Sequence, residues 1–370
     1  ALTLGIHGAN MPYLRILGLP LILALLAACS DGSDNSDNRQ DIRPPLSLSY
    51  SPPPIDLSGI TANYAQDVRY GDGERNLFDI YLPDCDEPTA LVIYIHGGGF
   101  TSGDKSMDNG DADTIREFLQ SCVAYATINY FLLGVPSQDD GTSAIVSQGG
   151  VLTSLRDTAR ALQFMRYHFA SLNLDPPRVA VFGVSAGAGA SLWLGTHDDL
   201  ADPASADPVL RESTRVVAVG AIATQSTYEL LRWEEILLPL TNSFAEILGG
   251  TDIPTIAATI GATNYMLTFL GVPTVEAIFT PDNDAYRANV DMLGLMDAGD
   301  APIFVHNFDI DLANLNLLNV FLHHGLHAVA VRERAVEVGL ENVAYIDDPA
   351  YAFKDPSGET LNSFLLRHVK

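Results

Sequence analysis

The fold is decided by the stretch Arg178–Ser191, which reads RVAVFGVSAGAGAS. A short run of β-branched and aromatic residues leads into the pattern Gly-x-Ser-x-Gly around Ser185, and small residues follow. This order predicts a strand, a sharp turn and a helix, with the serine hydroxyl held at the end of a sheet in a strained backbone conformation. Ser185 is therefore the candidate nucleophile.

A second motif lies upstream, where the apolar run Leu91–Ile95 leads directly into His96–Phe100, which reads HGGGF. Glycines directly after a buried strand allow backbone N–H groups to approach a developing oxyanion, the charge that acyl transfer must stabilise. A glycine-rich turn without a ligand is the alternative for this motif alone. The two motifs in this order are much more specific than either one.

Together the two motifs resemble the α/β-hydrolase fold, and within it the hormone-sensitive-lipase and carboxylesterase-like esterases. The resemblance is firm from about residue 61 to residue 202 and looser beyond. It implies a serine-dependent ester hydrolase without a cofactor, with Ser185 as the nucleophile. It also implies an oxyanion hole made by the N–H groups of Gly98, Gly99 and Ala186.

Strand-like and helix-like segments alternate along the chain and predict an α/β fold, with a mostly parallel central sheet and helices on both faces. An antiparallel hairpin over residues 68–82 opens the domain, which is expected to span residues 59–370. Residues 225–296 interrupt the alternation with apolar helical stretches. Such esterases often place a lid at this point, and a packing subdomain without substrate contact is the alternative.

The N-terminal part of the chain is predicted to direct export. Within residues 1–28, with Met11 as the expected start, one basic residue precedes an apolar run that ends in Leu-Ala-Ala directly before Cys29. This ending resembles the bacterial lipobox, which implies lipidation of Cys29 and anchoring to the cell envelope, at the outer membrane or its periplasmic face. An ordinary signal or a buried helix is the alternative. The polar and proline-rich residues 29–58 are predicted to form a disordered tether.

The composition limits the partners of this chain. Its net charge of -26 and pI near 4.4 disfavour nucleic acid and anionic substrates, so a small neutral ester is expected. The membrane is expected to be contacted through the lipid anchor only, and no metal site is expected. Cys85 and Cys122 each precede a predicted core strand, and either a disulfide or two buried thiols fits the sequence.

A nucleophilic serine needs a general base, and the resembled family carries it after the last strand, as Gly-His-Gly-Phe or similar. This chain has Ala350–Phe353 at that place, which reads AYAF. Tyr351 cannot serve as the usual base. Either the activity has been lost or the histidine has moved.

A relocated base is available in residues 321–327, which read FLHHGLH and lie between the last two predicted strands. Loops after adjacent parallel strands emerge at the same end of a sheet, so a histidine there can reach Ser185. His324 is the first choice, followed by His323 and His327. Helix-end capping is the alternative for this cluster, and metal binding is less favoured because no carboxylate or cysteine has suitable ligand spacing.

The acid that orients the base is expected directly after the strand at residues 302–306. Asp309 is the first choice there and Asp311 the second. If the histidine has moved into this connection, Asp347 or Asp348 after the last strand is the alternative.

These observations predict an exported, membrane-tethered serine esterase. The rival from another class is a catalytically inactive lipoprotein of the same fold that binds a ligand or a partner protein, supported by Tyr351 at the usual place of the base. A peptidase is disfavoured because no separate propeller-like domain is present in the sequence.

Overall fold

The computed structural model describes residues 43–106, 111–136, 149–310 and 316–370. The predicted export signal, the lipidation site Cys29 and the first part of the tether lie outside the described residues and stay predictions. No helix within the described residues is both long enough and apolar enough to cross a bilayer.

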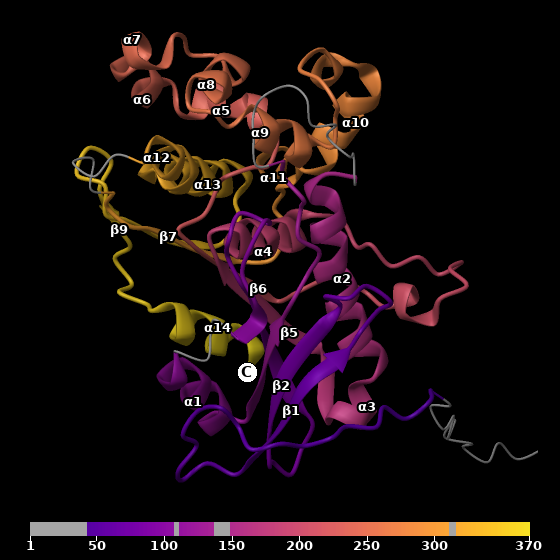
Figure 1. Ribbon diagram of the computed structural model, residues 1–370. Coiled ribbons are helices and arrows are strands. Elements are labelled where there is room, and N and C mark those ends of the chain that lie inside the picture. Colours follow the sequence, from indigo (N-terminus) through magenta and orange to yellow (C-terminus); the bar gives the residue numbers. More distant parts are fainter. Residues whose placement is uncertain (1–42, 107–110, 137–148, 311–315) are drawn as a thin grey trace, which may run out of the picture. The chain divides into compact units, whose positions relative to one another are not determined.

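The described strands form one sheet in the order β1-β2-β4-β3-β5-β6-β7-β8-β9 (Figure 1). The neighbours from β4 to β8 pair in parallel, whereas β1, β2 and β9 pair antiparallel. The strands are β1 (Ala62–Arg69), β2 (Leu77–Pro83), β3 (Thr89–Ile95), β4 (Val123–Ile128), β5 (Leu174–Val184), β6 (Ala218–Ile222), β7 (Ile303–Asn307), β8 (Asn342–Ile346) and β9 (Phe353–Lys354). The predicted α/β-hydrolase sheet and its opening hairpin are confirmed.

Helices cover both faces of the sheet. Successive side chains of a strand point to opposite faces, so apolar side chains on both faces need a covering layer. Leu91 and Ile93 of β3 belong to one apolar cluster, and Val92 and Tyr94 belong to the other. Helices α2, α4 and α13 supply buried residues to the first cluster, and α1 and α14 supply them to the second. These helices are α1 (Ala112–Gln120), α2 (Val151–Tyr167), α4 (Ala186–Thr196), α13 (Gly325–Val338) and α14 (Leu361–Val369).

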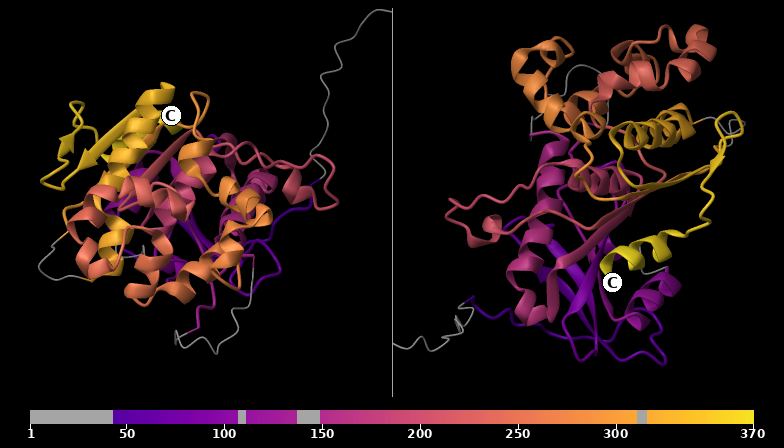
Figure 2. Two further views of the ribbon diagram at one scale, coloured as in Figure 1. Left: turned by 90° about the horizontal axis from the view of Figure 1, so that it is seen from above. Right: turned by 180° about the vertical axis from the view of Figure 1, so that it is seen from behind.

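The expected insertion between β6 and β7 is a chain of short helices. They lie over one end of the sheet, as the view from above shows (Figure 2). They are η3 (Leu230–Arg232), α5 (Trp233–Ile236), α6 (Leu238–Ser243), α7 (Ala245–Leu248), α8 (Ile253–Thr259), α9 (Thr263–Leu270), η4 (Glu276–Phe279), α10 (Pro281–Asn289) and α11 (Met292–Leu295). Three short elements outside the insertion complete the described helices: α3 (Phe169–Leu172), η2 (Pro208–Arg211) and α12 (Leu317–His323).

The prediction of a disordered tether over residues 29–58 extends too far, because residues 43–58 are part of the folded domain. Residues 43–58 lie against the domain: the Arg43 guanidinium donates to the Tyr167 carbonyl at 3.2 Å, and the Ser51 N–H donates to the Tyr64 carbonyl at 2.9 Å. Leu46 and Leu48 pack against one apolar cluster, and Ile55 and Leu57, which follow the last proline of the segment, pack against the other. Burial of these side chains outweighs the proline-rich composition, which predicts a free chain.

Cys85, just after β2, and Cys122, just before β4, form a disulfide that closes a 37-residue separation. This decides between the two alternatives that the sequence leaves open. Because a cross-link lowers the entropy of the unfolded chain, replacing both cysteines with serine should lower the free energy of unfolding by about 3–4 kcal/mol. Urea denaturation of the variant and of the wild-type protein measures this difference.

Reduced wild-type protein is the matched control, since it loses the same cross-link without a change of sequence. It should unfold at nearly the same urea concentration as the double variant. Equal midpoints for the oxidised protein and the double variant would contradict a stabilising role for this bridge.

Candidate active site

Ser185 occupies the turn between β5 and α4, with φ 56° and ψ -120°. A positive φ is strained for a residue other than glycine, and the Ser185 N–H is held by the Ile222 carbonyl at 2.9 Å. A Cβ atom on Gly187 would lie 1.9 Å from the Ile95 carbonyl oxygen, and one on Gly183 would lie 2.4 Å from the Gly187 backbone. The glycines of the motif are therefore required by the close approach of two strands and a helix.

The imidazole of His323 faces this serine: the Ser185 Oγ and His323 Nε2 atoms are 2.8 Å apart. His323 is the last residue of α12, which lies in the connection between β7 and β8. The sequence predicts a moved histidine in this connection, and the structure brings one of the three candidates to Ser185.

The first choice among these candidates is corrected, because His323 and not His324 contacts Ser185. Helix α12 ends one residue before His324, whose backbone turns to φ -54° and ψ 144°. The His324 Nδ1 atom accepts from the Leu326 N–H at 3.2 Å and caps α13, and its Nε2 atom lies 3.4 Å from the Asp348 carboxylate. Helix capping, the alternative for this cluster, describes His324.

His327 is fully buried and also lies away from Ser185. Its Nε2 atom donates to the Phe321 carbonyl at 2.8 Å, and its Nδ1 atom accepts from the Ser226 N–H at 3.3 Å. Burial lowers the pKa of His327 to about 3, so this ring stays neutral.

No group of three or more potential ligands for a metal ion occurs within the part of the chain that the structure describes.

Three buried side chains hold the end of α12 in place. Their N–H groups donate to four successive backbone carbonyls, which a helix terminus leaves without partners of its own. The pairs are His327 Nε2 with Phe321 O (2.8 Å), Gln225 Nε2 with Leu322 O (2.7 Å), and Asn307 Nδ2 with His323 O and His324 O (3.3 Å each). The position of the His323 ring is thus fixed from the ends of β6 and β7 and from α13.

None of the described aspartates predicted as the acid contacts His323. Asp309 is exposed, Asp347 pairs with His306 at 2.8 Å, and Asp348 faces His324. These three assignments are corrected, because side chains already paired elsewhere or turned to solvent cannot orient this ring. Asp311, the remaining choice, lies outside the described residues.

Asn319 lies beside His323 Nδ1, the atom that the acid is expected to contact. Its side-chain Oδ1 atom lies 2.9 Å from His323 Nδ1, and its backbone oxygen lies 3.2 Å from the same nitrogen. Sequence reasoning missed this residue because it considers only carboxylates. The available signal is the spacing of four residues within one helix, which places Asn319 and His323 on the same face.

The HGGGF turn lies directly against the serine turn. A Cβ atom on Gly97 would lie 2.8 Å from the Val184 carbonyl oxygen and 3.2 Å from Ser185 Cβ. Gly98 and Gly99 have φ values of 107° and 60°, which favour glycine. Ala186 is the first residue of α4, so its N–H has no partner within its own helix.

The insertion is bonded to both turns. The Tyr265 hydroxyl donates to the Gly99 carbonyl and the Tyr228 hydroxyl donates to the Ala186 carbonyl, each at 2.8 Å. Tyr228 fits because residue 189 is a glycine: a Cβ atom there would lie 2.0 Å from the tyrosine oxygen. These contacts place the insertion at the site, as the lid prediction requires.

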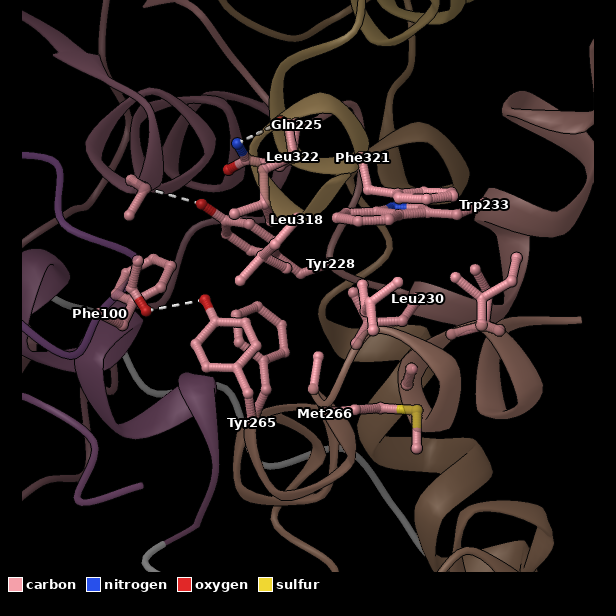
Figure 3. A pocket seen from close by; sticks show the side chains of 18 of the residues that line it. Phe100, Gln225, Tyr228, Leu230, Trp233, Tyr265, Met266, Leu318, Phe321 and Leu322 are labelled. Carbon is pink, nitrogen blue, oxygen red and sulfur yellow. Dashed lines mark hydrogen bonds between the residues drawn. The ribbon is translucent and has the colours of Figure 1, made fainter. Parts of the chain in front are cut away.

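Ser185 is one of the residues that line an apolar pocket of about 690 Å³, counting the space open to solvent. Figure 3 shows its large side chains, among them Trp233, Tyr265 and Phe321. One part of its wall comes from α8 and α9, and another comes from α12 and the start of the insertion. Its large apolar side chains include Leu230, Trp233, Ile256, Met266, Phe321 and Leu322. The insertion therefore lines the pocket and is not a remote packing subdomain.

Curated proteins match short parts of this chain. The probable isoprenylcysteine alpha-carbonyl methylesterase ICMEL1 of Arabidopsis thaliana is 27% identical over 124 residues, which are 33% of this chain and 22% of that protein. Carboxylesterase patB of Penicillium expansum is 36% identical over 102 residues, which are 27% of this chain and 18% of that protein. The chain thus spans about a fifth of the length of these relatives.

Solved structures match over most of the chain. A truncated carbohydrate esterase from gut microbiota superposes with a TM-score of 0.56 at 16% identity, covering 88% of this chain and 99% of that one. Esterase B from Lactobacillus rhamnosis has a TM-score of 0.52 at 14% identity, covering 83% and 85%. At these identities the likeness shows the shared fold. The BD-FAE family model matches residues 78–265, just over half of the chain, and this protein therefore belongs to the BD-FAE family.

Proposed function

We propose that this protein is a serine-dependent carboxylic ester hydrolase that works through an acyl-enzyme on Ser185. The observation that carries the proposal is the 2.8 Å contact between Ser185 Oγ and His323 Nε2, and Ser185 also lines an apolar pocket. A serine hydroxyl becomes nucleophilic when an adjacent base can take its proton. The matching relatives named as esterases support the same class of reaction.

In the proposed reaction, His323 Nε2 accepts the hydroxyl proton while Ser185 Oγ attacks the ester carbonyl carbon. The N–H groups of Gly98, Gly99 and Ala186 stabilise the oxyanion that forms. His323 then returns the proton to the departing alcohol, which leaves an acyl group on Ser185. A water molecule, deprotonated by the same imidazole, releases the acid and restores the serine.

The substrate we propose is a neutral ester with an apolar acyl or alcohol part. Aromatic and aliphatic side chains of the insertion line the pocket, so a hydrocarbon chain gains free energy by leaving water there. The net charge of -26 disfavours anionic substrates at the same time.

A fluorophosphonate probe and a series of p-nitrophenyl esters test this proposal. We expect stoichiometric labelling of Ser185, located by peptide mass, and turnover that increases from acetate to esters of medium chain length. The increase is expected because each added methylene buried in the pocket contributes about 0.8 kcal/mol.

A protein that neither labels nor turns over any ester of the series would contradict the proposal. That result would favour the rival assignment, an inactive protein of the same fold that binds a ligand, for which Tyr351 is the supporting feature. Labelling without a dependence on chain length would contradict only the choice of an apolar substrate.

A further inference from the structure

In a serine hydrolase the third residue holds the imidazole in the tautomer that accepts the serine proton, and this residue is ordinarily a carboxylate. Here the proton positions follow from the contacts of His323. The Asn319 backbone oxygen, 3.2 Å from His323 Nδ1, can only accept a hydrogen bond. Nδ1 therefore carries the proton, and Nε2 is left as the acceptor that faces Ser185 Oγ at 2.8 Å.

The side chain of Asn319 completes this arrangement. Its Oδ1 atom, 2.9 Å from the same Nδ1–H, is a second acceptor, so the ring is held by a neutral amide. Both residues lie on α12, one turn apart. Resting on the proposed esterase function, we propose that Asn319 is the positioning residue of the site, in place of the usual carboxylate.

An uncharged partner changes the electrostatics of the base. Burial lowers the pKa of His323, and within the described residues the hydrogen bond to the Asn319 backbone opposes this shift. Among the described residues, His324 and His327 are the titratable neighbours, and burial lowers their pKa values as well. Gln225 and Asn307, which bond to the end of the helix, are neutral.

The sign of the pH dependence follows from this environment. The base works in its neutral form, so kcat/KM falls as the pH drops through the pKa of His323. Because that pKa lies below the usual value of about 6.5, activity should persist into mildly acidic solution. An aspartate at position 319 would favour the imidazolium and raise the same pKa.

Two substitutions of Asn319 test the proposal. Asn319→Ala should lower kcat by about 10- to 100-fold with little change in KM, because the ring loses one of its two acceptors. Asn319→Asp restores the acceptor, so it should recover most of kcat and shift the acidic limb of the pH profile upward by about one pH unit. Asn319 is exposed, so the Tm of both variants should stay close to the wild-type value.

The matched controls are Asp309→Asn and Asp311→Asn, which remove the carboxylates that the sequence predicts as the acid. Asp309→Asn should retain activity within about threefold of the wild-type protein, since Asp309 is exposed and neutralising an exposed charge is a small perturbation. The proposal requires the same result for Asp311→Asn, because it assigns the orientation of the base to the Asn319 amide and not to a carboxylate. If either control loses activity by more than about 100-fold while Asn319→Ala stays active, a carboxylate orients the base and the proposal is overturned.

A second measurement does not need turnover. The pKa of His323, followed by NMR in the wild-type protein and in Asn319→Asp, should be higher in the variant. An unchanged pKa would show that residue 319 does not face the ring and would overturn the proposal even if no ester is hydrolysed. Failure of the esterase assignment is recognised separately, by a Ser185 that does not label in the wild-type protein.

Discussion

Replacing Ser185 with alanine is expected to lower kcat/KM for a short p-nitrophenyl ester by about 10⁴- to 10⁶-fold. The substitution removes the oxygen that attacks the carbonyl carbon, and what remains is the weaker catalysis by the oxyanion turn and substrate binding. Initial rates at substrate concentrations well below KM measure the loss directly.

Ser191→Ala is the matched control, because it removes a serine hydroxyl from α4, the helix that begins directly after Ser185. The Ser191 Oγ atom donates to the Gly187 carbonyl, four residues earlier, at 2.8 Å. This variant should keep its rate within about threefold, the effect of losing one weak local hydrogen bond. A Ser185→Ala variant with more than about a tenth of the wild-type rate would refute covalent catalysis at this residue.

Replacing His323 with alanine should lower kcat/KM by a similar factor, about 10⁴-fold or more, since the serine loses the group that takes its proton. Binding of an uncharged, non-hydrolysable ester analogue should change little. Rates for the variant measured from about pH 4 to about pH 8, a range that extends well below the usual histidine pKa, should lose the acidic limb of the wild-type profile.

His324→Asn provides the comparison with the neighbouring histidine. Asparagine can still accept from the Leu326 N–H and cap α13, so the fold is preserved while the imidazole is removed. This variant should remain within about fivefold of the wild-type rate, because the imidazole loses its contacts with Asp348 and Tyr351 while the Ser185–His323 pair is retained. If His324→Asn is inactive and His323→Ala is active, the two histidines have exchanged the roles that their contacts imply.

Much of the architecture can be predicted from the sequence because the informative features are local. The β-branched run before Ser185 and the small residues after it leave few alternatives to a strand, a tight turn and a helix. The HGGGF motif is informative for the same reason, since side chains cannot fit where two turns touch. The core strand β3 reads as a continuous apolar run because it is covered on both faces.

The choice among the three histidines could not be made from the sequence. It depends on the residue at which α12 ends, and that residue is determined by donors far away in the chain, Gln225 and Asn307. A shift of one residue rotates a helical side chain by about 100° and would exchange His323 for His324. The amide partner Asn319 cannot be recognised from residue type, because the position beside the base is ordinarily held by a carboxylate.

The bonds from Tyr228 and Tyr265 to the two turns have a mechanical consequence for substrate entry. Each hydroxyl ties the insertion to a peptide group whose neighbouring N–H is proposed to contact the reacting carbonyl. If the insertion swings outward to admit a bulky ester, these tethers break and the turns lose their bracing. An open insertion and a braced oxyanion turn would then exclude each other. Hydrolysis would follow only after the insertion has closed over the bound substrate.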